Sequence, residues 1–296
     1  MTWVIAGGAG QLGKALTFIL KERGIDFNSY GSADLDIRST TNTKNVLAQM
    51  CPSVVINAAA WTDVDRAESE PDSTYSVNTE GALNLAIAAK AVGAVFAQIS
   101  TDYVFSGTRS TPWQEGDLRD PASVYGASKA AGEVAVLSAY PEATYLFRTA
   151  WLYSPWGKNF AKTMTRLALK GKEQVRVVGD QIGQPTSALD LARQIIDAIS
   201  IELPYGIYHG TNSGEASWFE FAQEIFRLSG GNVNRLVQID STEIARLANR
   251  PVYSVLGHEA WKLTGATGVT IPAMRNWLIA LGEIMPEIIS EIDMER

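Results

Sequence analysis

Residues 2–13 read Thr-Trp-Val-Ile-Ala-Gly-Gly-Ala-Gly-Gln-Leu-Gly, and this stretch decides the fold. Its first five residues form a short apolar run typical of a buried strand, and the residues after the glycines favour a helix as far as Arg23. Gly7, Gly10 and Gly13 follow the spacing GxxGxxG, which lets the backbone turn tightly and approach a pyrophosphate at the helix N-terminus. The order strand, glycine loop, helix favours a dinucleotide-binding unit over a merely tight connection.

Strands and helices alternate through residues 1–150. Apolar or β-branched runs predict strands at 25–30, 53–56, 94–99 and 145–149. Helices are predicted from a Ser39 or Thr40 cap to Met50, from Pro71 onward, and at 124–138. This alternation predicts an α/β fold with a doubly wound parallel sheet. Ligands bind such sheets beyond the carboxyl ends of the strands, so the segments that follow the strands are the candidates for a site.

Segments after the second and third strands could line a cofactor site. Gly31-Ser32 at the tip of the second strand offers neither an acid for a ribose 2'-hydroxyl nor an arginine for a 2'-phosphate. The sequence therefore leaves NADH and NADPH open, since Ser32 could bond either form. Asp36 and Ile37 fit a place beside the adenine, and a solvated loop aspartate is the alternative. The run 58–60 is all alanine, which leaves room for a floor under a cofactor or packs closely.

Two short runs, 100–103 and 124–129, carry the candidate chemistry. Tyr125 and Lys129 lie four residues apart in a predicted helix, so both project from one face, with the hydroxyl close to the ammonium. A nearby cation favours the phenolate, and we expect Lys129 to lower the pKa of Tyr125 from about 10 toward the range of acid catalysis. Taken alone, such residues are more often a surface pair. Thr101 ends the fourth strand, and the loop after it can fold this hydroxyl toward Tyr125.

The composition excludes several classes of protein. A chain of 296 residues with 46% hydrophobic content can bury one large core or two modest ones. The net charge of -7 and the scattered Lys and Arg residues leave no footprint for nucleic acid, so we expect no such partner. One cysteine, Cys51, and the histidines His209 and His258 provide neither an internal disulfide nor a zinc cluster. Without a bilayer-length apolar run or a signal peptide, we expect no membrane partner and a cytoplasmic location.

Residues 151–296 follow a different pattern. Strand signals at 175–178 and 206–209, with helix signals at 161–170, 189–200, 218–229 and 271–294, predict a smaller C-terminal α/β portion. We therefore expect a dinucleotide-binding domain at 1–150 and a mainly substrate-binding portion at 151–296. Aromatic residues before the first of these helices could shape a ligand pocket or form a small second core; they are Trp151, Tyr153, Trp156 and Phe160.

These features jointly resemble the extended short-chain dehydrogenase/reductases, and more narrowly the dTDP-4-dehydrorhamnose reductase family. The runs that fall in that family's order are GGAGQLG (7–13), NAAAWTDVDRAE (57–68), STDYVFSG (100–107), PWQE (112–115), VYGASKAAGE (124–133), FRTAWLY (147–153) and NFAKTM (159–164). The similarity covers essentially the whole chain. Gly31-Ser32 departs from it, because many relatives carry a threonine and an arginine there. The resemblance implies a Rossmann-like sheet to which about residues 180–200 return.

The resemblance also implies the reaction. A nicotinamide hydride would reach C4 of a dTDP-4-keto-6-deoxy-L-hexose, giving dTDP-L-rhamnose, with Tyr125 as proton donor and Lys129 on the nicotinamide ribose. Thr101 would hydrogen-bond the substrate carbonyl. The expected cofactor-binding residues are Gly7, Gly10, Gln11, Leu12, Gly13, Ser32, Asp36, Ile37, Ala58, Ala59, Ala60, Ile99, Tyr125 and Lys129. The expected substrate-binding residues are Thr101, Asp102, Trp151, Asn159 and Arg250.

Other readings stay open. Some members of the family are associated with Mg²⁺, but we find no carboxylate cluster to assign to it, and the protein could be a monomer or a homodimer. A non-catalytic dinucleotide-binding regulatory subunit is one rival, which the intact Thr101, Tyr125 and Lys129 disfavour. Another nucleotide-sugar 4-reductase, epimerase or dehydratase is the second. A dehydratase would carry a second acid after Asp102, where this sequence has Tyr103.

Overall fold

A six-stranded parallel sheet forms the centre of the molecule. The structure, a computed structural model, describes residues 2–294. The strand order is β10-β5-β4-β3-β1-β2, and every neighbouring pair is parallel. The strands are β1 (Trp3–Ala6), β2 (Phe27–Tyr30), β3 (Val54–Asn57), β4 (Val95–Thr101), β5 (Thr144–Thr149) and β10 (Gly206–His209). The predicted doubly wound parallel sheet is confirmed.

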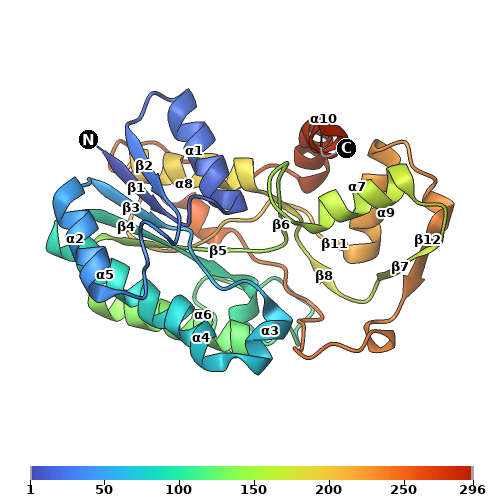
Figure 1. Ribbon diagram of the computed structural model, residues 1–296, viewed down its shortest axis with the longest axis horizontal. Helices are drawn as coiled ribbons and strands as arrows, with labels where there is room; N and C mark the ends of the chain where they lie inside the picture. Colours follow the sequence, from blue (N-terminus) through green and yellow to red (C-terminus); the bar gives the residue numbers. More distant parts are fainter. Residues whose placement is uncertain (1, 295–296) are drawn as a thin grey trace.

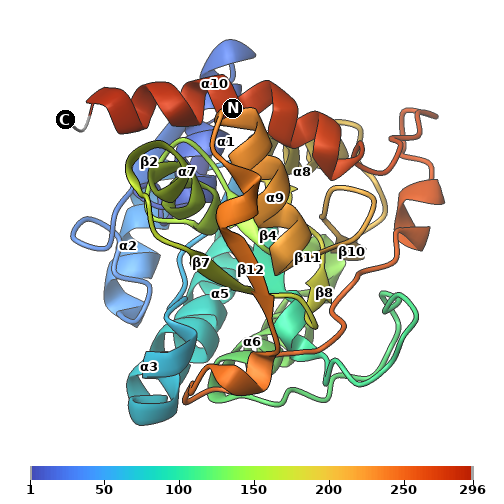
Figure 2. The ribbon, with the colours of Figure 1, turned by 90° about the vertical axis from the view of Figure 1, so that its right-hand side faces the viewer.

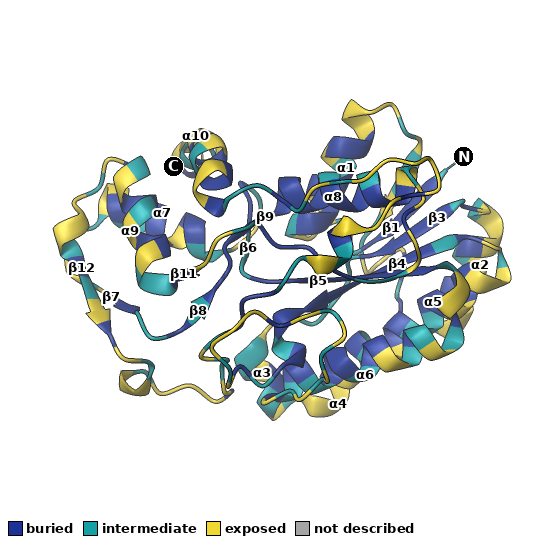
Figure 3. Cartoon of the chain, turned by 180° about the vertical axis from the view of Figure 1, so that it is seen from behind, coloured by how far each residue is buried: buried dark blue, intermediate teal, exposed yellow. Residues whose placement is uncertain are grey.

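Helices cover both faces of this sheet (Figure 1). The helix α1 (Gln11–Glu22) packs against α8 (Ala188–Ser200) on one face, and α2 (Thr40–Met50), α5 (Ala82–Ala91) and α6 (Val124–Ala139) pack side by side on the other. Side chains of β1 alternate between the two cores: Trp3 and Ile5 join the core that contains α1, whereas Val4 and Ala6 join the core that contains α5. Figure 3 shows the buried strands and the exposed outer faces of the helices.

The connection between β3 and α5 contains more structure than predicted. No helix was predicted between the third strand and Pro71, but α3 (Val64–Ser69) forms there because the Asp63 carboxylate caps it, accepting the Arg66 N–H at 3.1 Å. The predicted helix from Pro71 begins as α4 (Pro71–Tyr75) and passes through a π-helical turn, η1 (Ser76–Gly81), into α5. The predicted Ser39 cap of α2 is confirmed, since its side chain accepts the Asn42 N–H at 3.2 Å.

The remaining elements gather at one end of the molecule (Figures 1 and 2). A short parallel pair is formed by β7 (Val175–Val178) and β12 (Leu236–Ile239), with α7 (Phe160–Lys170), α9 (Trp218–Leu228) and α10 (Trp277–Met294) packed nearby. Two-residue strands join this portion to the main sheet; they pair as β6 (Leu152–Tyr153) with β9 (Thr186–Ser187) and β8 (Ile182–Gly183) with β11 (Ala216–Ser217).

One strand prediction placed a segment in the wrong sheet. Residues 206–209 were assigned to the smaller portion, but they form β10, which pairs with β5 at the edge of the main sheet, Gly206 opposite Tyr145 and His209 opposite Arg148. The physical reason is that α8 lies on the main sheet beside α1, so the strand that follows it reaches the free edge of β5.

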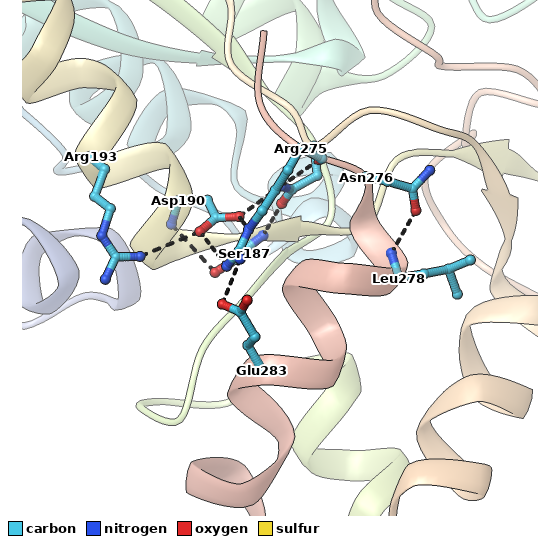
Figure 4. A network of polar contacts seen from close by, with 8 residues as sticks. Ser187, Asp190, Arg193, Arg275, Asn276, Leu278 and Glu283 are labelled. Atoms are coloured by element: carbon cyan, nitrogen blue, oxygen red, sulfur yellow. Dashed lines mark hydrogen bonds and ion pairs between the residues drawn. The ribbon is translucent and has the colours of Figure 1, made fainter. Parts of the chain in front are cut away.

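An ionic network fastens the C-terminal segment to the main sheet (Figure 4). Arg275, just before α10, donates to the Asp190 carboxylate of α8 from Nε at 2.8 Å and from Nη2 at 3.0 Å. Its Nη1 also contacts Glu283 of α10. Asp190 is buried and Arg275 is partly exposed, and the pair ties the end of the chain to a helix that packs on the main sheet.

Candidate active site

Two adjoining pockets open at the carboxyl ends of the strands. The first, of about 420 Å³, lies beyond β1, β2 and β3, and the second, of about 350 Å³, lies beyond β3, β4 and β5. Both are lined by Ala9, Gly10 and the alanines 58–60, so they form one continuous groove. Its size and place suit a dinucleotide laid across the strand ends. The predicted residues that line it are Gly7, Gly10, Gln11, Leu12, Ser32, Asp36, Ile37, Ala58, Ala59, Ala60, Ile99, Tyr125 and Lys129.

At the glycine loop, Gly7 and Gly10 contribute only backbone atoms to the wall of the groove. Gly7 has φ +81°, and a Cβ there would lie 2.5 Å from the Ala59 nitrogen. A Cβ on Gly13 would lie 2.3 Å from the Gly7 oxygen, so Gly13 makes the close packing of α1 on the loop possible. The open wall and the start of α1 fit the pyrophosphate of a dinucleotide.

The structure brings an arginine to the adenosine end that the sequence did not place there. Arg38 lines the first pocket together with Ser32 and Asp36. It donates to the Asp36 carboxylate from Nε at 2.9 Å and from Nη2 at 2.9 Å, and its own N–H bonds the same group at 3.0 Å. Because these bonds neutralise Asp36 and lower its pKa, no free carboxylate faces this end of the groove from that residue.

Tyr125 and Lys129 lie on the buried face of α6 and line the second pocket together, so the expectation of one shared face is met. The Lys129 ammonium donates to the Ile99 carbonyl at 2.6 Å, which fixes it beneath the end of β4. Burial lowers the pKa of Lys129 to about 8. The Tyr103 ring lies edge-on to the Tyr125 ring, with 5.5 Å between centroids, and holds the phenol in place.

The expectation that Lys129 lowers the pKa of Tyr125 is wrong for this structure. Burial raises the pKa of Tyr125 to about 12, and the influence that lowers it comes from hydrogen bonding with Thr101. The reason is that burial removes the phenol from water, which disfavours the charged phenolate. Tyr125 is therefore fully protonated at neutral pH.

Thr101 is the last residue of β4, and its hydroxyl lies beside Tyr125 as predicted. It accepts the Tyr103 N–H at 3.2 Å and donates to the Asp102 Oδ1 at 2.9 Å. Asp102 is 2% exposed, and its other oxygen, Oδ2, is buried without a hydrogen-bond partner. A buried hydroxyl, phenol and carboxyl group therefore meet at one point.

Below Lys129 on the same face of α6, Glu133 holds a buried ionic cluster. Its carboxylate accepts from Arg148 Nη2 at 2.7 Å and from Arg119 Nε at 2.5 Å, and from the Ser100 hydroxyl at 2.5 Å. The side chains of Glu133 and Arg148 are both fully buried. This cluster joins α6 to β4, β5 and the loop before α6, and so fixes the helix that carries Tyr125 and Lys129.

Aromatic residues shape the smaller portion. The Trp151 ring stacks on Trp218 at 3.5 Å, and Phe160 tilts against Trp218 at 4.7 Å. Next to this stack lies a pocket of about 280 Å³ whose walls combine Phe160, Trp218 and the ends of β7 with two arginines, Arg176 and Arg246. A flat apolar wall beside cations suits a nucleobase with a phosphate attached.

Two predicted substrate contacts have other partners. Asn159 caps α7 by accepting the Lys162 N–H at 2.9 Å, and its amide donates to Gln11 at 2.9 Å. Arg250 donates to the Asp65 carboxylate at 3.0 and 2.6 Å, and this pair lowers the pKa of Asp65 to about 2. Both side chains thus connect segments that are far apart in the sequence.

Several residues at the pockets escaped the sequence reasoning. Arg38, Thr62, Thr149, Lys158 and Arg246 each line one of the three pockets. Arg38, Thr62, Lys158 and Arg246 lie in loops, whereas Thr149 is the last residue of β5. A search for polar residues soon after each strand would have found Arg38 and Thr62. Within residues 2–294 no group of three or more metal-ligating side chains lies together, and no helix there could span a membrane.

The parallel sheet, the glycine loop and the Tyr125–Lys129 pair together define an extended short-chain dehydrogenase/reductase. The model of one family, the RmlD substrate binding domain, matches residues 1–288, and the chain belongs to that family. A Streptomyces griseus dTDP-4-dehydrorhamnose reductase is 43% identical over 97% of this chain and 93% of its own length. A Streptomyces niveus dTDP-4-keto-6-deoxy-D-glucose reductase is 38% identical over 96% of each chain.

A solved structure supports the same assignment. The dTDP-4-dehydrorhamnose reductase of Bacillus anthracis, crystallised in complex with NADP, is 39% identical and has a TM-score of 0.91. The match covers 97% of this chain and 99% of that one. The two folds therefore agree over nearly their whole length.

Proposed function

We propose that this chain reduces the C4 ketone of dTDP-4-dehydro-6-deoxy-L-mannose to give dTDP-L-rhamnose, the last step in making that sugar nucleotide, with NADPH or NADH. The observation that carries the proposal is that Tyr125 and Lys129 line the same groove as the glycine loop. Relatives named as dTDP-4-dehydrorhamnose reductases support the substrate. A bound nicotinamide dinucleotide supplies the hydride.

The chain's own residues supply the proton and hold the ketone. Tyr125 keeps its proton at neutral pH and releases it to the ketone oxygen as negative charge develops there. The Thr101 hydroxyl hydrogen-bonds the same oxygen, and Lys129, fixed by the Ile99 carbonyl, holds the ribose beside it. Trp151 flanks the deoxysugar from the smaller portion.

The nucleotide end of the substrate fits the smaller portion. We propose that the thymine lies in the pocket beside Phe160 and Trp218 and that Arg246, rather than Arg250, meets the diphosphate. Arg246 lines that pocket, whereas Arg250 is committed to Asp65. Residues 151–296 thus bind mainly sugar nucleotide and residues 1–150 mainly dinucleotide. We place the enzyme in the cytoplasm as a monomer or homodimer, with no metal assigned and no nucleic-acid or membrane partner.

The direct test supplies dTDP-4-keto-L-rhamnose with NADPH or NADH and follows the loss of reduced-cofactor absorbance. The product is then identified by NMR, because the configuration at C4 separates rhamnose from its talose epimer. We expect cofactor oxidation and the rhamnose product. Dinucleotide binding without oxidation would instead support a regulatory subunit, and the talose product would support a different 4-ketoreductase, a class to which the Streptomyces niveus relative points.

Arg38 sets the cofactor preference in this proposal. Its guanidinium stands at the adenosine end of the groove, where Asp36 neutralises part of its charge but leaves Nη1 free of that carboxylate. We expect Arg38→Gln to weaken NADP⁺ binding about tenfold, the loss of roughly one charge-assisted hydrogen bond at an exposed site. NAD⁺ binding should change by less than about twofold. Quenching of tryptophan fluorescence measures both affinities.

Arg227→Gln is the matched control, because Arg227 is an exposed arginine that likewise donates to one carboxylate, Glu224, from Nε and Nη2, but on α9. It should leave both affinities unchanged. Equal weakening of NAD⁺ and NADP⁺ by Arg38→Gln would mean that Arg38 only shapes the loop at 31–38.

A further inference from the structure

The Thr101 hydroxyl has one hydrogen, so it can donate to one acceptor at a time. In the structure that hydrogen is donated to Asp102 Oδ1 at 2.9 Å, while the oxygen accepts the Tyr103 N–H at 3.2 Å. The Tyr125 phenol is a further hydrogen-bonding neighbour of Thr101. A hydroxyl is a single donor, so Thr101 cannot donate to a substrate ketone while it donates to Asp102.

We propose that Asp102 is a positioning residue that works as a neutral acid: its O–H donates to Thr101, so that Thr101 donates its own hydrogen to the ketone. This inference rests on the proposed reductase function. The step is a reversal of two hydrogen bonds after Asp102 has taken up one proton from solvent. No covalent bond other than this O–H bond is made, and the proton remains on Asp102 through the reaction.

The surroundings of Asp102 favour the neutral form. The residue is 2% exposed, and its Oδ2 has no hydrogen-bond partner, which costs far less for a neutral carboxyl group than for a carboxylate. Burial raises the pKa of Asp102 to about 6, although the neighbouring hydroxyls of Ser254 and Thr101 lower it in part. An ordinary aspartate, with a pKa near 3.9, would be charged throughout the working range.

Among the described residues, two phenols and two arginines are the charged or titratable groups around this carboxyl group. Tyr103 follows it directly and Tyr125 faces it from α6, and the negative charge of Asp102 raises the pKa of both phenols. Arg246 and Arg250, on the loop after β12, exert their charge on Tyr103. Both phenols are neutral at physiological pH, so Asp102 is the group that titrates first at this point.

The sugar-nucleotide reduction should therefore depend on one proton. We expect kcat/KM of the unmodified enzyme to fall about tenfold per pH unit above the pKa of Asp102. Asp102→Asn presents a fixed amide N–H to Thr101 and cannot titrate. Its pH profile should be flat over the same range, with activity within about tenfold of the low-pH plateau.

A second variant should shift the pH profile of kcat/KM while Asp102 itself stays unchanged. Ser254 lowers the pKa of Asp102, so Ser254→Ala should shift the falling limb to higher pH. A merely structural role of Asp102 would leave that limb in place. Dinucleotide binding, measured by fluorescence, should be unchanged in both variants because neither residue lines the groove described above.

The pKa of Asp102 can also be read without turnover, from the ¹³C shift of its carboxyl carbon in the ligand-free protein, with Asp102→Asn to assign the signal. A pKa at the ordinary aspartate value would overturn the inference. So would an Asp102→Asn enzyme that keeps the falling limb, or one that loses more than about a hundredfold at every pH with dinucleotide still bound. No turnover of any 4-keto sugar nucleotide by the unmodified enzyme would instead refute the proposed function.

Discussion

Tyr125→Phe is expected to lower the rate of ketone reduction about 10³-fold or more while leaving dinucleotide affinity unchanged, because a positioned general acid contributes on this scale. The substitution removes one hydroxyl and keeps the ring that packs edge-on against Tyr103. The buried phenol has its pKa raised to about 12, so it is present in the proton-donating form at every working pH. Single-turnover rates with NADPH measure the loss.

Tyr103→Phe is the matched control for this experiment. It makes the same chemical change in the neighbouring ring, at 5.5 Å between centroids, and should reduce the rate by less than about tenfold. If Tyr125→Phe kept a rate within tenfold of the unmodified enzyme, the proton would have to come from another group, and the assignment of Tyr125 would fail.

The predictable part of the fold is the part that local pattern determines. The strand runs at 2–6 and 53–56 and the helix that carries Tyr125 are all present, because a buried strand or an amphipathic helix shows its period in its own residues. The position of β10 could not be predicted in this way. Its pairing with β5 joins residues about 60 positions apart, and a strand of four residues does not indicate which sheet edge it will reach.

The site, like the fold, was predictable where local geometry determines the structure. Tyr125 and Lys129 share a face by helical geometry alone, and the structure brings them together as the sequence predicted. Burial, by contrast, depends on the whole fold, so the raised pKa of Tyr125 was missed. The partner of a side chain also depends on the whole fold: Arg250 was expected to bind substrate, but in the structure it pairs with Asp65, 185 positions away.

The buried Glu133 carboxylate should make a large contribution to the stability of the fold. We expect Glu133→Gln to reduce the free energy of unfolding by about 3–5 kcal/mol, because it leaves the fully buried Arg148 guanidinium without its counter-charge. Urea unfolding followed by circular dichroism measures the change. Glu259→Gln, which breaks the exposed pair with Lys262, is the control and should cost less than about 1 kcal/mol.

The pH dependence gives an independent check on the same cluster. Hydrogen bonds and charge from Arg148 hold the pKa of Glu133 below its ordinary value despite burial. A carboxyl group whose pKa is lower in the folded state stabilises the fold above the unfolded pKa, near 4.3, and this contribution is lost as the pH falls toward the folded value. The difference in stability between the unmodified protein and Glu133→Gln should thus shrink in acid.

A double variant separates the charge from the packing. Glu133→Gln with Arg148→Met removes both charges of the buried pair, so it should recover part of the stability lost in the single variant. The Arg119 side chain is 26% exposed, so water can solvate its charge when the Glu133 carboxylate is removed. If the double variant were no more stable than Glu133→Gln alone, the loss would come from the shape of the cluster, and its unpaired charge would not be the cause.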